Sequence, residues 1–482
     1  IGTFTPEGTF DAAAERLAYL RDLGVTALEI MPVAEFSGGR NWGYDGVDWF
    51  APSRNYGGPD ALKRLVDAAH GHGLAVLLDV VYNHFGPEGN YLRQYSPEYF
   101  TDRYKTPWGG ALNYEGCLWA RKLALDNVRY WLEEFHVDGF RCDATFAIFD
   151  ASAKHLLREL SETVRKANRR AVLIAETHEN DVRYLTPDGY DFDAVWADDF
   201  HHTVRRTLAG DHDGYYEDYQ GGAEEIARTI NQGFLFEGQR SKYTRHKRGT
   251  PARERPPRQF VYCIQNHDQV GNRAFGDRLT ATMGLDAYRL AAMVLLLLPY
   301  TPLLFMGQEF AATSPFQYFT DHGPELGRLV TTGRRGEFKK FATFGEDVPD
   351  PQAEETFQRS KLAWRELDNT PGREVHDLYR EALRLRAGDP LLAAQDRSAM
   401  KAQAAGAVLA VSLGGDRRLL LANFGQAAAT VQWGALRLAS ASWRMLLDSN
   451  DGRYGGSGKK MAWLQPGGVT VDGCSAVLLG PA

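Results

Sequence analysis

Leu74-Ala75-Val76-Leu77-Leu78-Asp79-Val80-Val81-Tyr82-Asn83-His84 is an apolar run that ends in polar and ionisable side chains. An apolar run without polar alternation is typical of a parallel strand buried on both faces. Three further apolar runs end in the same way, in Gly139-Phe140-Arg141-Cys142-Asp143-Ala144, Ile174-Ala175-Glu176-Thr177 and Ile264-Gln265-Asn266-His267-Asp268. Charged side chains directly after several buried strands are costly unless they face one shared, solvated site. The four motifs therefore predict a single catalytic pocket at the strand ends.

The first four hundred residues alternate between strands of this kind and amphipathic helices. We expect strands over 1–4, 27–33, 74–78, 137–143, 171–176, 194–197, 260–264 and 303–306, and helices over 10–23, 60–72, 118–135 and 152–168. Eight strands separated by helices or long loops predict an α/β fold, a closed (β/α)8 TIM barrel whose active site lies at the carboxyl ends of its strands. An open doubly wound sheet is the alternative, but the glycine-rich phosphate loop of a dinucleotide-binding sheet is missing after the first strand.

The pattern changes shortly after residue 400. Short strands with glycine-rich turns follow, at 408–412, 419–423, 429–433, 443–447 and 476–479. We therefore expect a catalytic barrel over 1–400 and a small antiparallel β-sandwich domain over 401–482. The barrel carries an insertion after its third strand, 83–116, and a basic loop, 239–258, which we interpret as a solvated loop beside the barrel mouth.

Composition narrows the class of protein. The chain has 482 residues, 44% hydrophobic and 24% charged, and a formal net charge of -7, which disfavours a nucleic-acid partner. The four cysteines show no metal-ligand or disulfide spacing, which fits a reducing, cytoplasmic compartment. The pair His201-His202 is expected at the surface or at the rim of the pocket rather than on a metal ion. The apolar stretch 290–306 is long enough to suggest a membrane span, but Pro299 and Pro302 interrupt it, so a buried helix followed by a strand is expected. The first residue is not Met, and we expect that residues upstream are missing.

Three carboxyl groups from different strand ends suit hydrolysis of a glycosidic bond. Retention of configuration needs two carboxyl groups about 5 Å apart, one ionised and one protonated. Arg141 lies two residues before Asp143, on the same face of a strand, where a guanidinium favours the ionised nucleophile. Glu176 faces two carboxylates that raise its pKa, which suits a general acid. Asp268 is then left to stabilise the distorted sugar ring. Each carboxyl group taken singly could instead belong to a structural ion pair or be a metal ligand.

At this point the motifs resemble the four signature regions of the alpha-amylase family of glycoside hydrolases. The resemblance extends along essentially the whole chain, and it includes 2–10, 41–47, 79–91, 197–202, 265–273 and 314–322. The last two stretches resemble the members that release trehalose from maltooligosyl trehalose. The resemblance implies a retaining hydrolase that cuts the α-1,4 bond next to the terminal trehalose unit. It acts on maltooligosyl trehalose and related α-1,4-glucans, with no organic cofactor, no nucleic acid and no membrane.

The resemblance also implies residue roles. By motif position Asp143 is the nucleophile, Glu176 the acid/base and Asp268 the transition-state stabiliser. The residues that bind the sugar in the cleaved subsite are then His84, Arg141 and His267. Tyr44 stacks on that sugar, and Asp79 supports Arg141. No metal site is expected, although the Asn83 position holds calcium in some members.

Two departures from the family pattern concern the leaving-group side and the amino end. Many amylases carry Lys-His three and four residues after the nucleophile, whereas this chain has Phe146 and Ala147. The trehalose-releasing members favour His at the Phe146 place. These enzymes also begin with a β-sandwich domain, whereas this chain starts inside the expected first strand. A 1,4-alpha-glucan branching enzyme and a general alpha-amylase are the rival functions, and a non-catalytic glycan-binding member is a third. Branching enzymes usually have Glu after the stabilising Asp, where this chain has Gln269.

Overall fold

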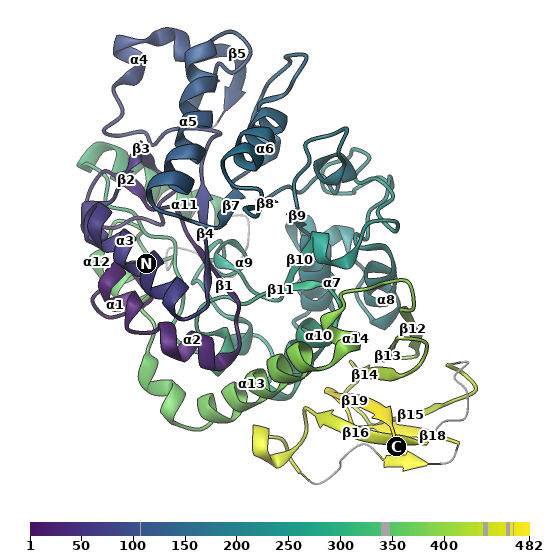
Figure 1. The fold of residues 1–482 in the computed structure, drawn as a ribbon. Helices are drawn as coiled ribbons and strands as arrows, with labels where there is room; N and C mark the ends of the chain where they lie inside the picture. Colours follow the sequence, from purple (N-terminus) through teal and green to yellow (C-terminus); the bar gives the residue numbers. More distant parts are fainter. Residues whose placement is uncertain (107, 339–347, 437–441, 459–462, 466) are drawn as a thin grey trace.

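A seven-stranded parallel sheet forms the centre of the molecule (Figure 1). The computed structural model describes residues 1–482 except 107, 339–347, 437–441, 459–462 and 466. The sheet has the order β1 (Ala27–Ile30), β4 (Ala75–Val80), β7 (Gly139–Cys142), β8 (Val172–Ala175), β9 (Ala194–Trp196), β10 (Phe260–Cys263) and β11 (Thr301–Leu303). Every neighbouring pair is parallel, and Figure 1 shows that the sheet is strongly curled.

The expected first strand at 1–4 is wrong. These residues form a turn, in which the amide of Phe4 donates to the carbonyl oxygen of Ile1 at 3.0 Å. The carbonyl oxygen of Thr3 accepts from the amide of Leu362 at 2.9 Å, so this backbone is paired outside the sheet. Among the described residues no strand pairs β1 with β11, so the sheet of the expected (β/α)8 barrel has seven paired strands and is curled into a half-barrel.

Both faces of the sheet are buried, which explains the unbroken apolar runs. Side chains that face the barrel interior form one cluster, and it consists of Leu77, Ile174, Ala194, Trp196, Val261 and the partly buried Leu303. The alternate side chains, such as Leu78 and Phe140, pack outward into the main core under the helices. Gly139 allows β7 and β8 to pair closely, because a Cβ there would lie 2.1 Å from the carbonyl oxygen of Val172.

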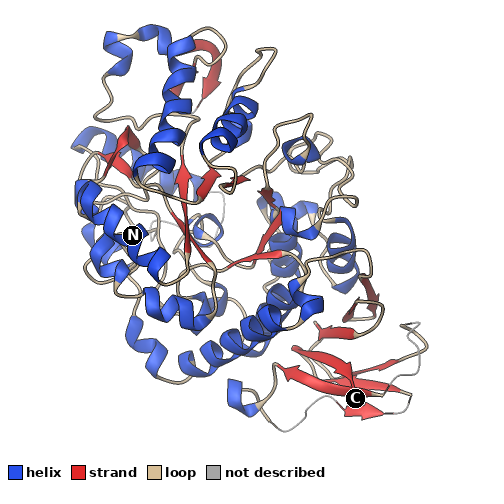
Figure 2. Ribbon diagram, in the orientation of Figure 1, coloured by secondary structure: helices blue, strands red, loops and turns tan. Residues whose placement is uncertain are grey.

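Helices surround the sheet (Figure 2). The main ones are α1 (Phe10–Ala14), α2 (Leu17–Leu23), α3 (Gly58–Gly71), α5 (Leu118–Glu134), α6 (Leu156–Ala167), α7 (Asp198–Leu208), α8 (Ala223–Gln232), α10 (Leu285–Leu297), α11 (Pro324–Phe338) and α13 (Gly372–Gly388). The helix expected over 10–23 is two helices, since the chain breaks at Glu15–Arg16. The apolar α10 is almost wholly buried and leads to β11, as expected. Among the described helices we find no apolar segment long enough to span a bilayer.

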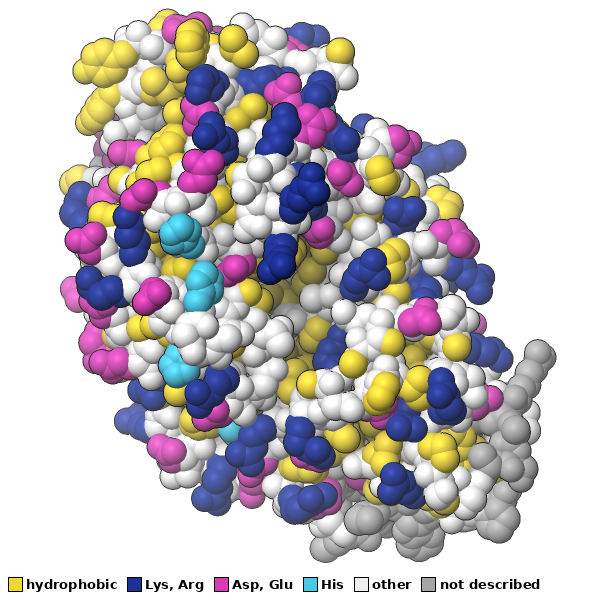
Figure 3. All heavy atoms as spheres, viewed as in Figure 1, with side chains coloured by type: hydrophobic (Ala, Val, Ile, Leu, Met, Phe, Trp, Pro, Cys, Tyr) yellow, Lys and Arg dark blue, Asp and Glu magenta, His cyan; other side chains and the backbone are white. Residues whose placement is uncertain are grey.

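The two insertions differ in structure. Residues 83–116 form a lobe with α4 (Leu92–Tyr95) and the hairpin of β5 (Phe100–Thr106) and β6 (Gly109–Leu112). The basic loop 239–258 has one short bridge, between Arg240 and Lys247. Its interpretation as a solvated loop is only partly correct, because Ser241 and Ala252 are fully buried and Arg248 reaches into the protein. Basic and acidic side chains are interspersed over the face drawn in Figure 3.

The C-terminal part consists of antiparallel sheets. One sheet contains β12 (Lys401–Ala405), β13 (Val408–Leu413), β14 (Arg418–Asn423), β19 (Ser475–Pro481) and β16 (Trp443–Asp448); the other contains β15 (Ala429–Gln432), β18 (Gly468–Val471) and β17 (Trp463–Gln465). Apolar side chains such as Val408, Leu421 and Val469 pack between them. The alternate side chains, such as Leu409 and Leu478, join the main core. We propose that the domain boundary lies between α14 (Pro390–Ala393) and β12.

Candidate active site

The predicted site residues come together at the carboxyl ends of the central strands. Asp79 on β4 lies in register with Arg141 on β7. Asp143 follows β7 and Glu176 follows β8, and the amide of Glu176 donates to the carbonyl oxygen of Cys142 at 3.0 Å. Asp268 lies in the first turn of α9 (His267–Gly271), just beyond β10. The strand-end pattern in the sequence therefore does bring these side chains to one place.

The guanidinium of Arg141 lies at the centre of this group and is fully buried. Its Nη1 donates to Asp79 Oδ2 at 2.7 Å and to Asp143 Oδ1 at 2.8 Å. Its Nη2 lies 3.5 Å from Glu176 Oε2. One cation therefore touches three carboxyl groups, two of which, Asp143 and Glu176, are partly open to solvent, at 14% and 19% exposed.

Local backbone geometry orients the two partly exposed carboxyl groups. Asn83 donates from Nδ2 to Asp143 Oδ2 at 2.8 Å. The amide of Ala144 donates to Glu176 Oε2 at 2.5 Å. Ala144 adopts a left-handed conformation with φ of 39°, which costs energy for a residue with a side chain and is often found at functional sites. The turn after β7 thus links the two carboxyl groups directly.

Burial changes the ionisation of two of the acids. Glu176 has its pKa raised to about 8, first by burial and then by the Asp143 and Asp268 charges, against the opposing effect of Arg141. The raised pKa of Glu176 is expected from the sequence as an effect of the neighbouring carboxylates, but burial is the larger cause. Burial also raises the pKa of Asp79 to about 7. Glu176 is therefore protonated at neutral pH, as a general acid must be.

Tyr44 lies beside the carboxyl groups, in the loop between β2 (Ala34–Phe36) and β3 (Gly46–Pro52). Its hydroxyl donates to Asp79 Oδ2 at 2.6 Å and lies 2.7 Å from His267 Nε2. Its ring stacks on the His267 ring, with the centroids 5.2 Å apart. His84 donates from Nε2 to the backbone oxygen of Tyr44 at 2.9 Å. That hydrogen bond occupies Nε2, so its sugar contact remains a prediction.

Asp268 is the most open of the three predicted catalytic acids, with 37% of its side chain exposed. His267 Nε2 lies 3.4 Å from Asp268 Oδ2, and Asn272 donates to Asp268 Oδ1 at 3.2 Å. A carboxylate held from one side and open on the other is free to face a ligand.

Several neighbours of the site were missed from the sequence. Asn83, which the resemblance connects only with calcium, donates its side-chain amide to Asp143. Asp198 and Asp199 follow β9 in the same way as the other acids follow their strands, so the same signal predicts them. Trp108 stacks on His84 with the ring centroids 3.8 Å apart. Nothing in the local sequence pattern indicates that stack. Among the described residues no group of three or more His, Cys, Asp or Glu side chains could hold a metal ion.

The pair His201-His202 was expected at the surface or the pocket rim, and this is wrong. Both side chains are buried, at 1% and 7% exposed. Burial lowers the pKa of His202 to about 3, so it is neutral. His202 Nδ1 lies 3.0 Å from the hydroxyl of Tyr219, and Gln269 Nε2 lies 3.4 Å from His202 Nε2. Both side chains therefore lie in the protein interior.

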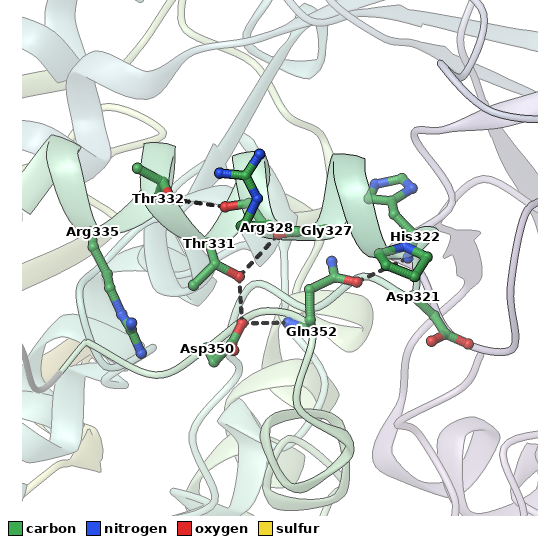
Figure 4. Close-up of a pocket in the computed structure, with 10 residues that line it drawn as sticks. Asp321, His322, Gly327, Arg328, Thr331, Thr332, Arg335, Asp350 and Gln352 are labelled. Carbon is green, nitrogen blue, oxygen red and sulfur yellow. Dashed lines mark hydrogen bonds between the residues drawn. The ribbon is translucent and has the colours of Figure 1, made fainter.

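A polar cavity of about 500 Å³ lies along α11 (Figure 4). Its lining residues are Asp321, His322, Pro324, Gly327, Arg328, Thr331, Thr332, Arg335, Asp350 and Gln352. None of the predicted site residues is among them. His322 connects it to the Tyr44 loop, since His322 Nε2 lies 3.6 Å from Asp45 Oδ2. The carboxyl groups predicted to be catalytic are therefore not part of this cavity's lining.

Known proteins share both the sequence and the fold. The model of the alpha amylase catalytic domain matches residues 2–108. A malto-oligosyltrehalose trehalohydrolase of Deinococcus radiodurans is 49% identical over 431 residues, which cover 88% of this chain and 71% of that protein. The protein of that name from Saccharolobus solfataricus is 44% identical, with 80% and 67% covered. A solved structure described as a putative alpha amylase from Salmonella typhimurium superimposes with a TM-score of 0.89, at 40% identity, over 99% of this chain and 80% of that chain.

The rival family matches only in part. A 1,4-alpha-glucan branching enzyme of Corynebacterium efficiens is 34% identical over 193 residues, which cover 34% of this chain and 26% of that protein. The trehalohydrolase matches are longer and more similar, and they extend over the barrel that carries the carboxyl groups. The chain therefore belongs to the malto-oligosyltrehalose trehalohydrolases, glycosidases of the alpha-amylase family.

Proposed function

We propose that this chain cuts the α-1,4-glucosidic bond next to the terminal trehalose unit of maltooligosyl trehalose and releases trehalose. The observation that carries the chemistry is the shared guanidinium of Arg141, which touches Asp143 at 2.8 Å and lies 3.5 Å from Glu176. Two carboxyl groups on one guanidinium are close enough to flank a single glycosidic linkage. Glu176 is protonated at neutral pH, so it can act as the proton donor that a retaining mechanism needs beside its nucleophile.

In this mechanism Asp143 attacks the anomeric carbon while Glu176 donates its proton to the glycosidic oxygen. The bond to trehalose breaks and a covalent glucosyl ester forms on Asp143. Glu176, now ionised, takes a proton from water, and that water cleaves the ester and regenerates both groups. Asp268, open to the site, stabilises the positive charge that develops on the sugar ring in each step. Arg141, His84, His267 and Tyr44 surround the same sugar.

Arg141 and Asp79 prepare the nucleophile for the first step. The buried guanidinium donates to Asp143 Oδ1, which holds that oxygen in place. Asp79 in turn accepts from Arg141 and from the Tyr44 hydroxyl, so it fixes both side chains without facing the substrate. These contacts support the proposal that Asp79 is a supporting residue.

The reaction fits trehalose biosynthesis in the cytoplasm, and we propose that role and location. All four cysteines are free thiols, and three of them are buried. Buried thiols without disulfide partners are usual in reducing compartments.

Product analysis on two matched substrates tests the function. Maltotriosyl trehalose and maltopentaose have the same number of glucosyl units but end in trehalose and maltose respectively. We expect rapid release of trehalose and maltotriose from the first and slow cleavage of the second. Equal cleavage of both would identify a general alpha-amylase. New α-1,6 branches without free trehalose would identify a branching enzyme.

A further inference from the structure

Asp199 is a buried carboxylate that joins several loops at the mouth of the barrel. It is the second residue of α7, directly after β9, and it is fully buried. It accepts hydrogen bonds from Asn180 Nδ2 at 2.7 Å, Tyr219 Oη at 2.6 Å, the amide of Leu235 at 2.6 Å and the amide of Phe236 at 3.1 Å. Arg248 Nη2 completes the set at 3.0 Å. These partners come from four separate segments of the chain, none of which is a barrel strand.

Arg248 extends this network from the basic loop toward the catalytic acid. Its Nε donates to the backbone oxygen of His178 at 2.7 Å, and its Nη1 donates to the Tyr219 hydroxyl at 2.8 Å. Its guanidinium lies 5.1 Å from the centre of the Phe236 ring. The side chain is only 11% exposed, so most of it serves the protein rather than solvent. Arg248 therefore ties the segment after β8 to the buried charge of Asp199.

The segment 176–180 carries Glu176 at its start and is held at both His178 and Asn180 by this network. The exposed His178 ring meets the Phe146 ring edge to face, with the centroids 4.0 Å apart. Phe146 occupies the place where the sequence departs from the amylase pattern. The general acid protonates the oxygen that joins the cleaved sugar to its leaving group, so the leaving group lies on the Glu176 side of the bond. Phe146 and His178 therefore border the leaving-group subsite.

We propose that Asp199 is a positioning residue that, through Arg248, holds segment 176–180 and so shapes the subsite for the trehalose leaving group. This inference rests on the proposed function. Asp199 does not reach the substrate. It acts because a buried carboxylate that accepts from several loops fixes their relative positions, and because its charge balances a guanidinium that is nearly buried. The proposed nucleophile Asp143 and its neighbours Tyr44 and Arg141 are held by other contacts, through Asp79 and Asn83. A longer chain of contacts, from Tyr219 through His202 to Gln269, leads to α9.

The separation of these two networks allows a substrate-based test. α-Maltosyl fluoride presents the same kind of cleaved sugar, but its leaving group is a fluoride ion, which fills no sugar subsite and needs no proton. Maltotriosyl trehalose requires both the leaving-group subsite and the acid. A variant that changes only the leaving-group subsite thus has a lower kcat/KM for maltotriosyl trehalose and an unchanged kcat/KM for α-maltosyl fluoride. A general loss of structure lowers both.

The experiment compares Asp199→Asn and Arg248→Lys with the unmodified chain on both substrates. The Asn variant keeps an acceptor for the amides of Leu235 and Phe236 but places an NH2 group and no charge against Arg248. We expect kcat/KM for maltotriosyl trehalose to fall about 100-fold and that for α-maltosyl fluoride to stay within two-fold. Arg248→Lys keeps the charge but not the three-way hydrogen bonding, and we expect a loss of the same kind. If Asp199→Asn does not fold, Arg248→Lys alone tests the inference.

Asp193→Asn is the matched control. Asp193 also accepts from an arginine, Arg165 at 2.6 Å, but it lies just before β9, at the opposite end of the barrel strands from the site. We expect both substrates to be cleaved at unmodified rates. Equal losses on both substrates in Asp199→Asn and Arg248→Lys, or no loss in either, would overturn the inference. If the unmodified chain releases no trehalose at all, the proposed function fails instead, which is a separate outcome.

Discussion

Arg141 Nη1 lies 2.7 Å from Asp79 Oδ2 while it also donates to Asp143, so a supporting carboxylate and the proposed nucleophile share one nitrogen atom. The guanidinium is fully buried, and Asp79 is 2% exposed. A cation buried to this degree depends on its counter-charges, because the energy of removing it from water is recovered only through close carboxylates. Asp79 therefore contributes to folding as well as to the site.

Replacement of Asp79 tests this dual role. We expect Asp79→Ala to lower the free energy of unfolding by about 3–5 kcal/mol, the usual cost of breaking a buried pair. Asp79→Asn should lower it less, since it keeps one acceptor for Arg141. Denaturant unfolding at pH 8, above the raised pKa of Asp79, measures both. Asp48→Asn, an exposed acid on β3, is the control and should change stability little. An unchanged unfolding free energy in Asp79→Ala would contradict the argument.

The separate roles of Asp143 and Glu176 predict different chemical rescue. Both Asp143→Ala and Glu176→Ala should lose at least about 10³-fold in turnover on maltotriosyl trehalose. In the presence of azide, Asp143→Ala should form the β-glycosyl azide, because azide takes the place of the nucleophile. Glu176→Ala acting on α-maltosyl fluoride should form the α-glycosyl azide, because azide attacks the covalent intermediate. NMR of the products distinguishes the anomers, and reversed anomers would exchange the two assignments.

The raised pKa of Glu176 predicts the alkaline limb of the pH profile. Glu176 donates a proton only while it is protonated, and burial raises its pKa to about 8. We therefore expect kcat/KM for maltotriosyl trehalose to be high near neutral pH and to fall as the pH rises through about 8. With α-maltosyl fluoride that limb should be absent, since fluoride leaves without a proton. A limb at the same pH for both substrates would show that another group controls it.

The same shift predicts a pH-dependent stability change. In the unfolded chain Glu176 ionises near its ordinary value of 4.5, whereas in the folded protein it stays protonated up to about 8. The folded state thus binds the extra proton between these values, so stability is lost as the pH rises through this window. Glu176→Gln lacks this cost. We expect it to be more stable than the unmodified chain by on the order of 2–4 kcal/mol at pH 9, and by much less at pH 4.5.

Unfolding at several pH values measures this difference, with the surface variant Glu15→Gln as the control. That variant should show no trend with pH, because Glu15 is exposed. A constant stability difference for Glu176→Gln across the range would contradict the proton linkage.

The strand ends could be predicted because one sequence pattern carries two signals, an apolar run that indicates a buried strand and ionisable residues directly after it. Runs such as 74–84 show both the buried strand and the groups that follow it, so the barrel strands and the cluster of Asp143, Glu176 and Arg141 could be predicted. The expected strand at 1–4 was wrong because strand pairing depends on a partner. Its backbone bonds instead to residues near 362, which are distant in sequence.

Long-range partners account for the other misses. The strand β12 is rich in alanine, which has little strand preference, and it forms because β13 pairs with it. Arg248 lies in a loop whose basic composition suggests solvent, and only the fold brings it within 3.0 Å of Asp199. Burial of His201 and His202 likewise follows from the packing of α7 rather than from their own polarity.

Trp108 gives the last prediction, which concerns the side of the site opposite the leaving group. Its ring is parallel to the His84 ring, within 11°, with centroids 3.8 Å apart, and it is 47% exposed although His84 is buried. His84 follows β4, on the other side of β7 from Glu176 and β8. Because sugar rings bind on flat aromatic faces, the open face of Trp108 is suited to a glucosyl unit beyond the cleaved one.

We expect Trp108→Ala to raise KM for maltotriosyl trehalose about 10-fold, which corresponds to about 1.4 kcal/mol of lost binding, with kcat little changed. Trp108→Phe should keep most of the affinity, since it keeps a flat ring. Trp119→Ala is the matched control, because Trp119 is another exposed tryptophan, 60% exposed, in the first turn of α5. A lower kcat with an unchanged KM in Trp108→Ala would contradict this prediction. Loss of the stack on His84 would then disturb the chemistry at the cleaved sugar rather than the binding of remote glucosyl units.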